Sequence, residues 1–297
     1  MTAVQTFKSE TLARAFSAAL GGKHQPLFSE LTRVSGLPGT RINTSVALAL
    51  ADECVRAGKV ADPIVDALLA QDDERAPGGS PLEYLPVCGV YALGARVAAD
   101  PKRRAHALRV LHEAACDLRF RVREAVPLAL ARIGVQVGDG LLDELASWML
   151  TYFPAASVLF AVSRPEWGRT LAQARPAAAR LDDALALLYG APRSDRRYPG
   201  YKALQEAVVA AAGPLTARLG APILEVLEPW AKKDDPKLRD LVVQSMQNAT
   251  IRARHGDEAA AIEAAAEAAK PIPRDGKKVD LPTRKRGKKK RRRGPAQ

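Results

Sequence analysis

Cysteine, histidine and aromatic residues are all scarce in this chain of 297 residues. It contains three cysteines and four histidines, and no two cysteines have the Cys-x-x-Cys spacing. An odd number of cysteines without that spacing argues against a disulfide framework, so we expect a protein of the reducing cytoplasm. Aromatic residues make up 5% of the chain, whereas alanine and leucine are abundant. This composition favours helices, because small and unbranched side chains lose little freedom there.

The chain also lacks the motifs of several enzyme classes. It has no Gly-x-x-x-x-Gly-Lys phosphate loop, no Gly-x-Ser-x-Gly nucleophile elbow and no His-Glu-x-x-His zinc motif. His112 and Cys116 share a face of a predicted helix, but zinc takes three or four protein ligands, and His106 falls on another face. We therefore interpret His112 and Cys116 as core residues, and we expect no catalytic residue, no metal and no cofactor.

Residues 145–163 form nineteen positions without a charge, which is the length of a membrane span. Pro154 lies in the middle of this run, serine and threonine dilute its hydrophobicity, and no strong positive cluster flanks it. The run therefore predicts two short buried helices broken at Pro154, and no transmembrane segment. The first sixteen residues mix charged with apolar side chains, unlike a signal peptide.

The stretch from Asp100 to Gly134 has the periodicity of two consecutive helices. Asp100-Pro101 and Asp117 are helix-start signals, and Gly134 is expected to end the second helix as a left-handed cap. Apolar residues recur at helical spacing at Leu108, Leu111 and Ala115, and then at Val122, Ala125, Val126, Ala129, Leu130 and Ile133. Neither helix can bury its stripe alone, so the pair requires neighbours.

The same spacing recurs after Asp235-Pro236 and, more weakly, from Ile42 to Cys54. Recurrence of one helical hairpin is typical of an α-solenoid. Residues 117–134 resemble the second helix of a HEAT repeat, in which an Asp precedes a Val-Arg pair and apolar residues run on to Ile-Gly. Val122-Arg123 is that pair here, and its place is taken by Leu238-Arg239 in the second copy and by Ile42-Asn43 in the weak copy. Pro127 departs from the HEAT pattern and should kink its helix.

The resemblance implies an all-α fold, a HEAT-like (armadillo-like) α-solenoid of about five or six hairpins over residues 1–269. In such a repeat Asp117 would cap a helix and Arg123 would make a polar contact between repeats. Asp117→Ala should then reduce stability by about 1 kcal/mol.

HEAT-like repeats also form the alkylpurine DNA glycosylases, which hold a damaged base against Trp residues near a catalytic Asp. The residue types for such a site are present at Trp148, Trp167, Trp230, Asp143, Asp182 and Asp183. Their surroundings do not resemble the glycosylase motif, so the resemblance assigns no catalytic residue.

Two loops carry dense charge. Residues 190–202 interleave cations with tyrosines, as in single-stranded nucleic-acid sites, where cations pair with phosphates and rings stack on bases. The candidate residues there are Arg193, Arg196, Arg197, Tyr198 and Lys202. The alternative is an ordinary solvent loop. Residues 72–81 are expected to form a mobile loop whose Asp72-Asp73-Glu74 cluster is solvated, with a cation site as the alternative.

The C-terminal tail, residues 270–297, holds thirteen Lys or Arg residues and two Asp residues, a net charge of +11. The rest of the chain is therefore close to neutral, since the total is +12. Prolines and charge predict a disordered tail, because it cannot bury enough apolar surface to fold. Its candidate nucleic-acid-binding residues are Arg284, Lys285, Arg286, Lys288, Lys289, Lys290, Arg291, Arg292 and Arg293.

Together these features predict a cytoplasmic, non-catalytic binding scaffold. Its helical body would dock a protein partner, and its tail would contact DNA or RNA through counterion release, with a steep salt dependence. Two alternatives stay open: a DNA-repair enzyme resembling the HEAT-like glycosylases, and a peripheral membrane-associated protein. The tail has no interleaved apolar or aromatic residues to insert into a bilayer, which favours nucleic acid over a membrane.

Overall fold

The computed structural model describes residue 7 and residues 9–271, and the regular structure in this part is helical, without a strand. Its α-helices are α1 (Glu10–Leu20), α2 (His24–Val34), α3 (Thr44–Ala57), α4 (Asp62–Leu69), α5 (Tyr84–Ala99), α6 (Arg104–Ala115), α7 (Phe120–Val137), α8 (Gly140–Glu144), α9 (Tyr152–Val162), α10 (Pro165–Gly168), α11 (Ala174–Tyr189), α12 (Pro199–Leu219), α13 (Ala221–Ala231), α14 (Pro236–Met246), α15 (Ala249–Arg254) and α16 (Gly256–Ala268). Short 3-10 helices join them: η1 (Gly58–Ala61), η2 (Pro81–Glu83), η3 (Pro101–Arg103), η4 (Ala146–Leu150) and η5 (Asp195–Arg197). None of these described helices combines the length and the hydropathy needed to cross a bilayer.

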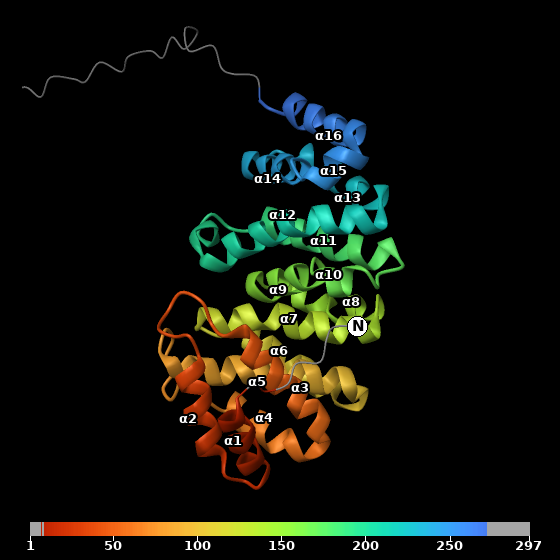
Figure 1. The fold of residues 1–297 in the computed structure, drawn as a ribbon. Helices are drawn as coiled ribbons and strands as arrows, with labels where there is room; N and C mark the ends of the chain where they lie inside the picture. Colours follow the sequence, from red (N-terminus) through yellow and green to blue (C-terminus); the bar gives the residue numbers. More distant parts are fainter. Residues whose placement is uncertain (1–6, 8, 272–297) are drawn as a thin grey trace, which may run out of the picture.

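The helices are stacked nearly in chain order along the long axis, with α1 and α2 at one end and α16 at the other (Figure 1). One row consists of α3, α5, α7, α9, α12 and α14, and each of these helices packs against the next. Beside it, α8 packs against α11, α11 against α13, and α13 against α16. Helices α4 and α6 cover α5 and α7, whereas α1 and α2 form a hairpin beside α5. The core therefore runs along the stack between neighbouring helices.

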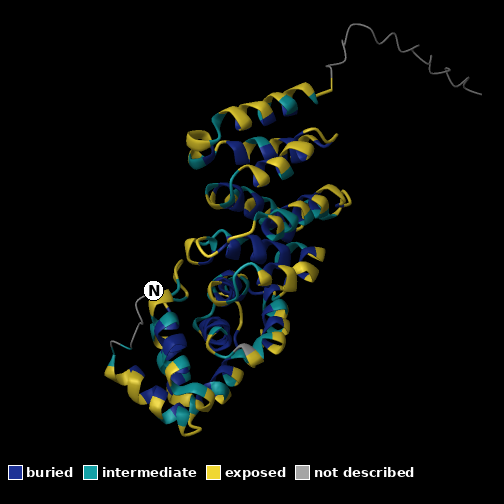
Figure 2. Ribbon diagram, turned by 90° about the vertical axis from the view of Figure 1, so that its right-hand side faces the viewer, coloured by how far each residue is buried: buried dark blue, intermediate teal, exposed yellow. Residues whose placement is uncertain are grey.

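The middle of the stack is more deeply buried than its C-terminal end (Figure 2). In α5 every residue from Tyr84 to Val97 is buried. Arg96 lies within this buried stretch and pairs with Asp62 of α4, with 3.1 Å between Nε and Oδ1, and Asp62 also pairs with Arg103. Helix α16 buries only one narrow stripe, formed by Ala259, Ile262 and Ala266. An end helix with a polar outer face closes a stack of this kind.

Two helices of the main row begin with the same arginine contact. In α7, Nη1 of Arg123 donates to the carbonyl of Asp117, and in α14, Nη1 of Arg239 donates to the carbonyl of Lys233 at 2.7 Å. Each arginine is the fourth residue of its helix, and each acceptor lies six positions earlier. The correspondence of Val122-Arg123 with Leu238-Arg239 in the sequence is thus a correspondence in three dimensions.

The weak third copy does not place Asn43 where the sequence pattern predicts it. Asn43 is the N-cap of α3, where its Oδ1 accepts the backbone N–H of Val46 at 3.4 Å. The position of α3 that corresponds to Arg123 is therefore Ala47, and Asn43 does not take the place of that arginine. A polar residue near a helix start fits either role, so local spacing alone could not separate them.

The prediction that Gly134 ends a helix is wrong. Helix α7 continues through Gly134 to Val137, and Gly138, with a φ of 70°, supplies the left-handed residue at its end. Gly134 is buried against the ring of Trp167, where no side chain fits. The helix also continues through Pro127, which leaves the carbonyl four residues earlier without its usual intrahelical donor.

Two predicted boundaries shift by a few residues. The uncharged run forms two helices, η4 and α9, but the break falls at the extended residue Thr151, and Pro154 lies in the first turn of α9. Asp100-Pro101 begins the 3-10 turn η3, and α6 itself starts at Arg104.

Candidate functional site

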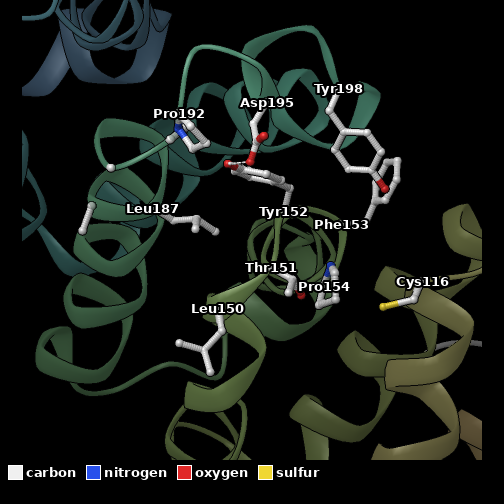
Figure 3. Close-up of a pocket in the computed structure, with 13 residues that line it drawn as sticks. Cys116, Leu150, Thr151, Tyr152, Phe153, Pro154, Leu187, Pro192, Asp195 and Tyr198 are labelled. Atoms are coloured by element: carbon white, nitrogen blue, oxygen red, sulfur yellow. Dashed lines mark hydrogen bonds between the residues drawn. The ribbon is translucent and has the colours of Figure 1, made fainter.

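A cluster of aromatic side chains joins the start of α9 to the start of α12. The ring of Tyr198 lies 5.4 Å from that of Phe153 and 6.1 Å from that of Tyr152, and Tyr152 contacts Tyr201 edge-on at 5.8 Å. The Tyr152 hydroxyl donates to the Asp195 carboxylate at 3.1 Å, as the dashed line in Figure 3 shows. This bond and the ring contacts fix the connection between α11 and α12 on the end of α9.

An open groove lies between this cluster and the ends of α6 and α11 (Figure 3). Its volume is about 640 Å³, and carbon atoms dominate its walls. The lining residues are Cys116, Leu150, Thr151, Tyr152, Phe153, Pro154, Ala186, Leu187, Gly190, Ala191, Pro192, Asp195 and Tyr198. Leu150 is 76% exposed and Tyr198 is 48% exposed, although both are large apolar or aromatic side chains. We call this feature the α9–α12 groove.

The structure separates the cations predicted in residues 190–202. Arg196 forms an ion pair with Asp235 at the start of α14, with 2.6 Å between Nη2 and Oδ2. Lys202 lies on α12 opposite Glu206, at 3.7 Å. Arg193 and Arg197 are exposed and form no ion pair with any described residue. Of the candidate cations in this loop, only these two arginines have no ion-pair partner among the described residues, and the ring of Tyr198 packs against Phe153.

Arg123 of α7 contacts the aromatic cluster at Phe153. Its guanidinium carbon is 4.2 Å from the centre of the Phe153 ring, which belongs to the next helix of the row. The same side chain donates to the carbonyl of Leu118 at 2.8 Å. Arg123 thus contacts both the turn before α7 and the next helix of the row, α9.

Arg119, which the sequence did not single out, holds two connections together. It is 7% exposed, and its Nε and Nη2 donate to the two oxygens of Asp117 at 2.9 and 2.7 Å. Its Nη1 reaches back to the carbonyls of Gln71, Asp72 and Ala76, at 2.8, 2.9 and 3.1 Å. The predicted mobile loop at residues 72–81 is therefore fastened to the start of α7.

Asp117 itself does not cap a helix, contrary to its predicted role. The N-cap of α7 is Arg119, and Asp117 accepts the backbone N–H of Arg119 at 2.7 Å and pairs with its guanidinium. Burial by itself would raise the pKa of Asp117. The hydrogen bonds from Arg119, with the charges of Arg119 and Arg123, outweigh burial and lower this pKa below its usual value of 3.8.

The lowered pKa predicts an acid-dependent effect of Asp117→Asn. Because the unfolded chain binds the proton more readily, the Asp117 contribution is complete above the unfolded pKa and decreases as the pH falls through the folded pKa. We expect Asp117→Asn to lower the free energy of unfolding by about 2 kcal/mol at pH 7, and this difference to shrink below about pH 4. Urea unfolding of both proteins across this pH range measures it. A difference that is constant with pH would contradict the role given to the carboxylate.

The three tryptophans considered for a glycosylase site are used in packing. Trp167 is fully buried, and Trp148, which is 4% exposed, meets the ring of His112 edge-on at 5.0 Å. Nε1 of Trp230 donates to the carboxylate of Asp182 at 2.7 Å. None of the three indole rings is free to stack on a base.

His112 and Cys116 do not form a metal site with other side chains. His112 packs on Trp148, whereas Cys116 is exposed at the groove, so the prediction that both are core residues holds for neither in full. Within the described residues no group of three His, Cys, Asp or Glu side chains could hold a metal ion. Cys54, Cys88 and Cys116 are all free thiols.

The predicted tail residues, Arg284 to Arg293, lie outside the described part of the chain. Leu150, Tyr152 and Phe153 are not among the predicted site residues, because the uncharged run predicts buried helices over its whole length. A signal was available: a polar residue, Thr151, and two aromatic residues, Tyr152 and Phe153, interrupt the middle of that run, where η4 gives way to α9. Comparisons with protein-family models, with curated proteins and with solved structures give no match.

Proposed function

We propose that this protein is a non-catalytic binding scaffold: a HEAT-like α-solenoid that docks a protein partner and contacts nucleic acid through its basic tail. The observation that carries the proposal is the α9–α12 groove, an open and mostly apolar depression at the edge of the helical stack. Its lining combines no set of nucleophile, base and metal ligands that would indicate a reaction. Exposed apolar surface of this kind is typical of interaction sites.

The repeated arginine contact supports the HEAT-like part of the proposal. Arg123 and Arg239 occupy equivalent positions in two hairpins of the stack and bond to equivalent carbonyls. In such a stack each hairpin buries its apolar stripe only against its neighbours. The stack therefore presents an extended surface that includes many loops. Such a surface suits binding of a partner rather than enclosure of a substrate.

The charge distribution supports the nucleic-acid part. Nearly all of the net charge lies in the tail, where nine cations occupy ten consecutive positions from Arg284 to Arg293. A segment of this density attracts polyanions through counterion release, with little preference for sequence.

The tail is tested by replacing its nine cations, Arg284 to Arg293, with glutamine in the full-length chain. Anisotropy of labelled duplex DNA, single-stranded DNA and RNA is then measured from about 50 to 200 mM salt. If about six tail cations engage phosphates, the affinity of the natural chain for single strands should fall with a log–log slope of about −4. The substituted chain should lose at least about 100-fold in affinity at the low salt.

The same comparison separates the alternatives. Unchanged affinity after the nine substitutions would place nucleic-acid binding on the helical body and contradict the role of the tail. If the natural chain binds none of the three nucleic acids but cosediments with anionic vesicles, the tail is a membrane tether instead. Absence of binding to all of these polyanions would remove nucleic acid from the proposal.

A further inference from the structure

We propose that the α9–α12 groove binds a short linear peptide segment in which two or three apolar residues are flanked by aspartate or glutamate. This inference rests on the proposed scaffold function and specifies the chemistry of the partner. It combines three observations: exposed apolar side chains, unpaired cations at the rim, and aromatic rings that are already engaged with one another.

The apolar residues of the partner are specified by the groove and its surroundings. Leu150 and Tyr198 expose much of their surface at the groove, and Leu118 and Phe120, which are 85% and 60% exposed, lie at the start of α7. Arg123 connects the two parts, since it bonds to the Leu118 carbonyl and covers the ring of Phe153. Leucine or aromatic side chains of a peptide would remove this surface from water without needing polar partners.

The acidic flanks follow from the charges at the rim. Arg193 and Arg197 directly adjoin the lining residues Pro192 and Tyr198, and neither forms an ion pair with a described residue. Two nearby carboxylates are paired with other arginines, Asp117 with Arg119 and Asp235 with Arg196. Asp195, which accepts the Tyr152 hydroxyl, is then the one carboxylate of the lining beside Arg193 and Arg197. The rim therefore has an excess of positive charge, which attracts an acidic segment and repels the cationic tail of this same chain.

A peptide fits the groove better than single-stranded nucleic acid. Stacking of bases requires free aromatic faces, but one face of Phe153 is covered by Arg123, and its ring meets Tyr198 edge-on. Tyr152 is held in place by its bond to Asp195, so its ring is not free to reorient toward a base. Thr151 and Asp195 are the only polar side chains of the lining besides the tyrosines and Cys116, too few to satisfy the edges of bases.

The test is a selection of random peptides, displayed on phage, against the immobilised full-length protein. Enriched peptides are synthesised with a fluorescent label and titrated by anisotropy against the natural chain and two groove variants. Leu150→Glu adds a charge at a largely exposed position, so the fold is little affected. The double variant Arg193→Glu with Arg197→Glu reverses the charge of the rim.

Each variant has a matched control far from the groove. Val60→Glu makes the same kind of change as Leu150→Glu at a residue that is 61% exposed in η1. Arg169→Glu with Arg175→Glu reverses two exposed cations near the opposite end of α11. We expect acid-flanked apolar motifs to be enriched, Leu150→Glu to raise their Kd at least about tenfold and the rim variant at least about fivefold. Both controls should stay within about twofold of the natural chain.

Three results would overturn the inference. If the enriched peptides bind both groove variants with the Kd of the natural chain, they bind elsewhere on the protein. The groove is then not the docking site, but the scaffold function stands. If the enriched peptides lack acidic residues and their Kd is the same for the rim variant as for the natural chain, the charge argument is wrong. If no peptide is enriched, the docking function itself fails together with its site.

Discussion

Replacing Gly134 with alanine should lower the free energy of unfolding by about 3 kcal/mol, although alanine is the better helix former. A Cβ atom at this position would lie 2.6 Å from Cγ of Trp167 and still closer to the fused carbons of the indole. Trp167 is fully buried, and its Nε1 donates to the carbonyl of Gly138 at 3.3 Å, so the ring cannot retreat without losing packing and a hydrogen bond. Either α7 or the ring must move.

Thermal unfolding measures this effect, with an expected decrease in Tm of roughly 5–10 °C. Gly256→Ala is the matched control, since a Cβ at Gly256 meets nothing within 4 Å. This control should be neutral or slightly stabilising, because alanine reduces the entropy of the unfolded chain. A double variant with Trp167→Leu should recover part of the loss of Gly134→Ala. A Tm for Gly134→Ala equal to that of the natural chain would show that the contact with Trp167 tolerates a methyl group.

Gly134 also shows how far the sequence could specify the fold. The apolar stripe from Val122 to Ile133 correctly predicts a helix, because its spacing depends only on the geometry of one helix. The predicted end of this helix is wrong, because an Ile-Gly pair is compatible both with a left-handed cap and with a close contact to another element. The choice depends on Trp167, which comes from a different part of the chain. Helix positions are local properties, whereas the use of a glycine is decided by its neighbours.

The same limit applies to the candidate site. The mixture of cations and tyrosines in residues 190–202 predicts a surface loop that could bind nucleic acid, and that role stays a prediction. The mixture could not show which of the charged groups have partners. Arg196 is neutralised by Asp235, thirty-nine positions away, while Tyr198 packs on Phe153 of α9. These partners are fixed by the stacking of hairpins, which has no local signal. The sequence therefore identifies the residue types of the loop, whereas the groove can be identified only in the folded structure.

Replacing Arg119 with alanine should have the second large effect, a loss of about 3–4 kcal/mol in the free energy of unfolding. Arg119 is buried and gives five side-chain hydrogen bonds, two to Asp117 and three to carbonyls between Gln71 and Ala76. Its removal leaves a partly buried carboxylate and several carbonyls without donors. Lysine should not restore stability, because a single ammonium cannot reproduce the planar fork of donors.

Hydrogen exchange then distinguishes this role from a general loss of packing. Residues 72–81 should lose protection first in Arg119→Ala, at the amides of Arg75, Ala76 and Gly79, which bond within this segment or to Glu83. Arg109→Ala, which removes an exposed arginine of α6, serves as the control and should leave both Tm and exchange unchanged. If these three amides keep their protection in Arg119→Ala, the loop is held by other contacts. If they exchange faster while the core of α5 stays protected, Arg119 is the residue that fastens the connection between α4 and α5 to the start of α7.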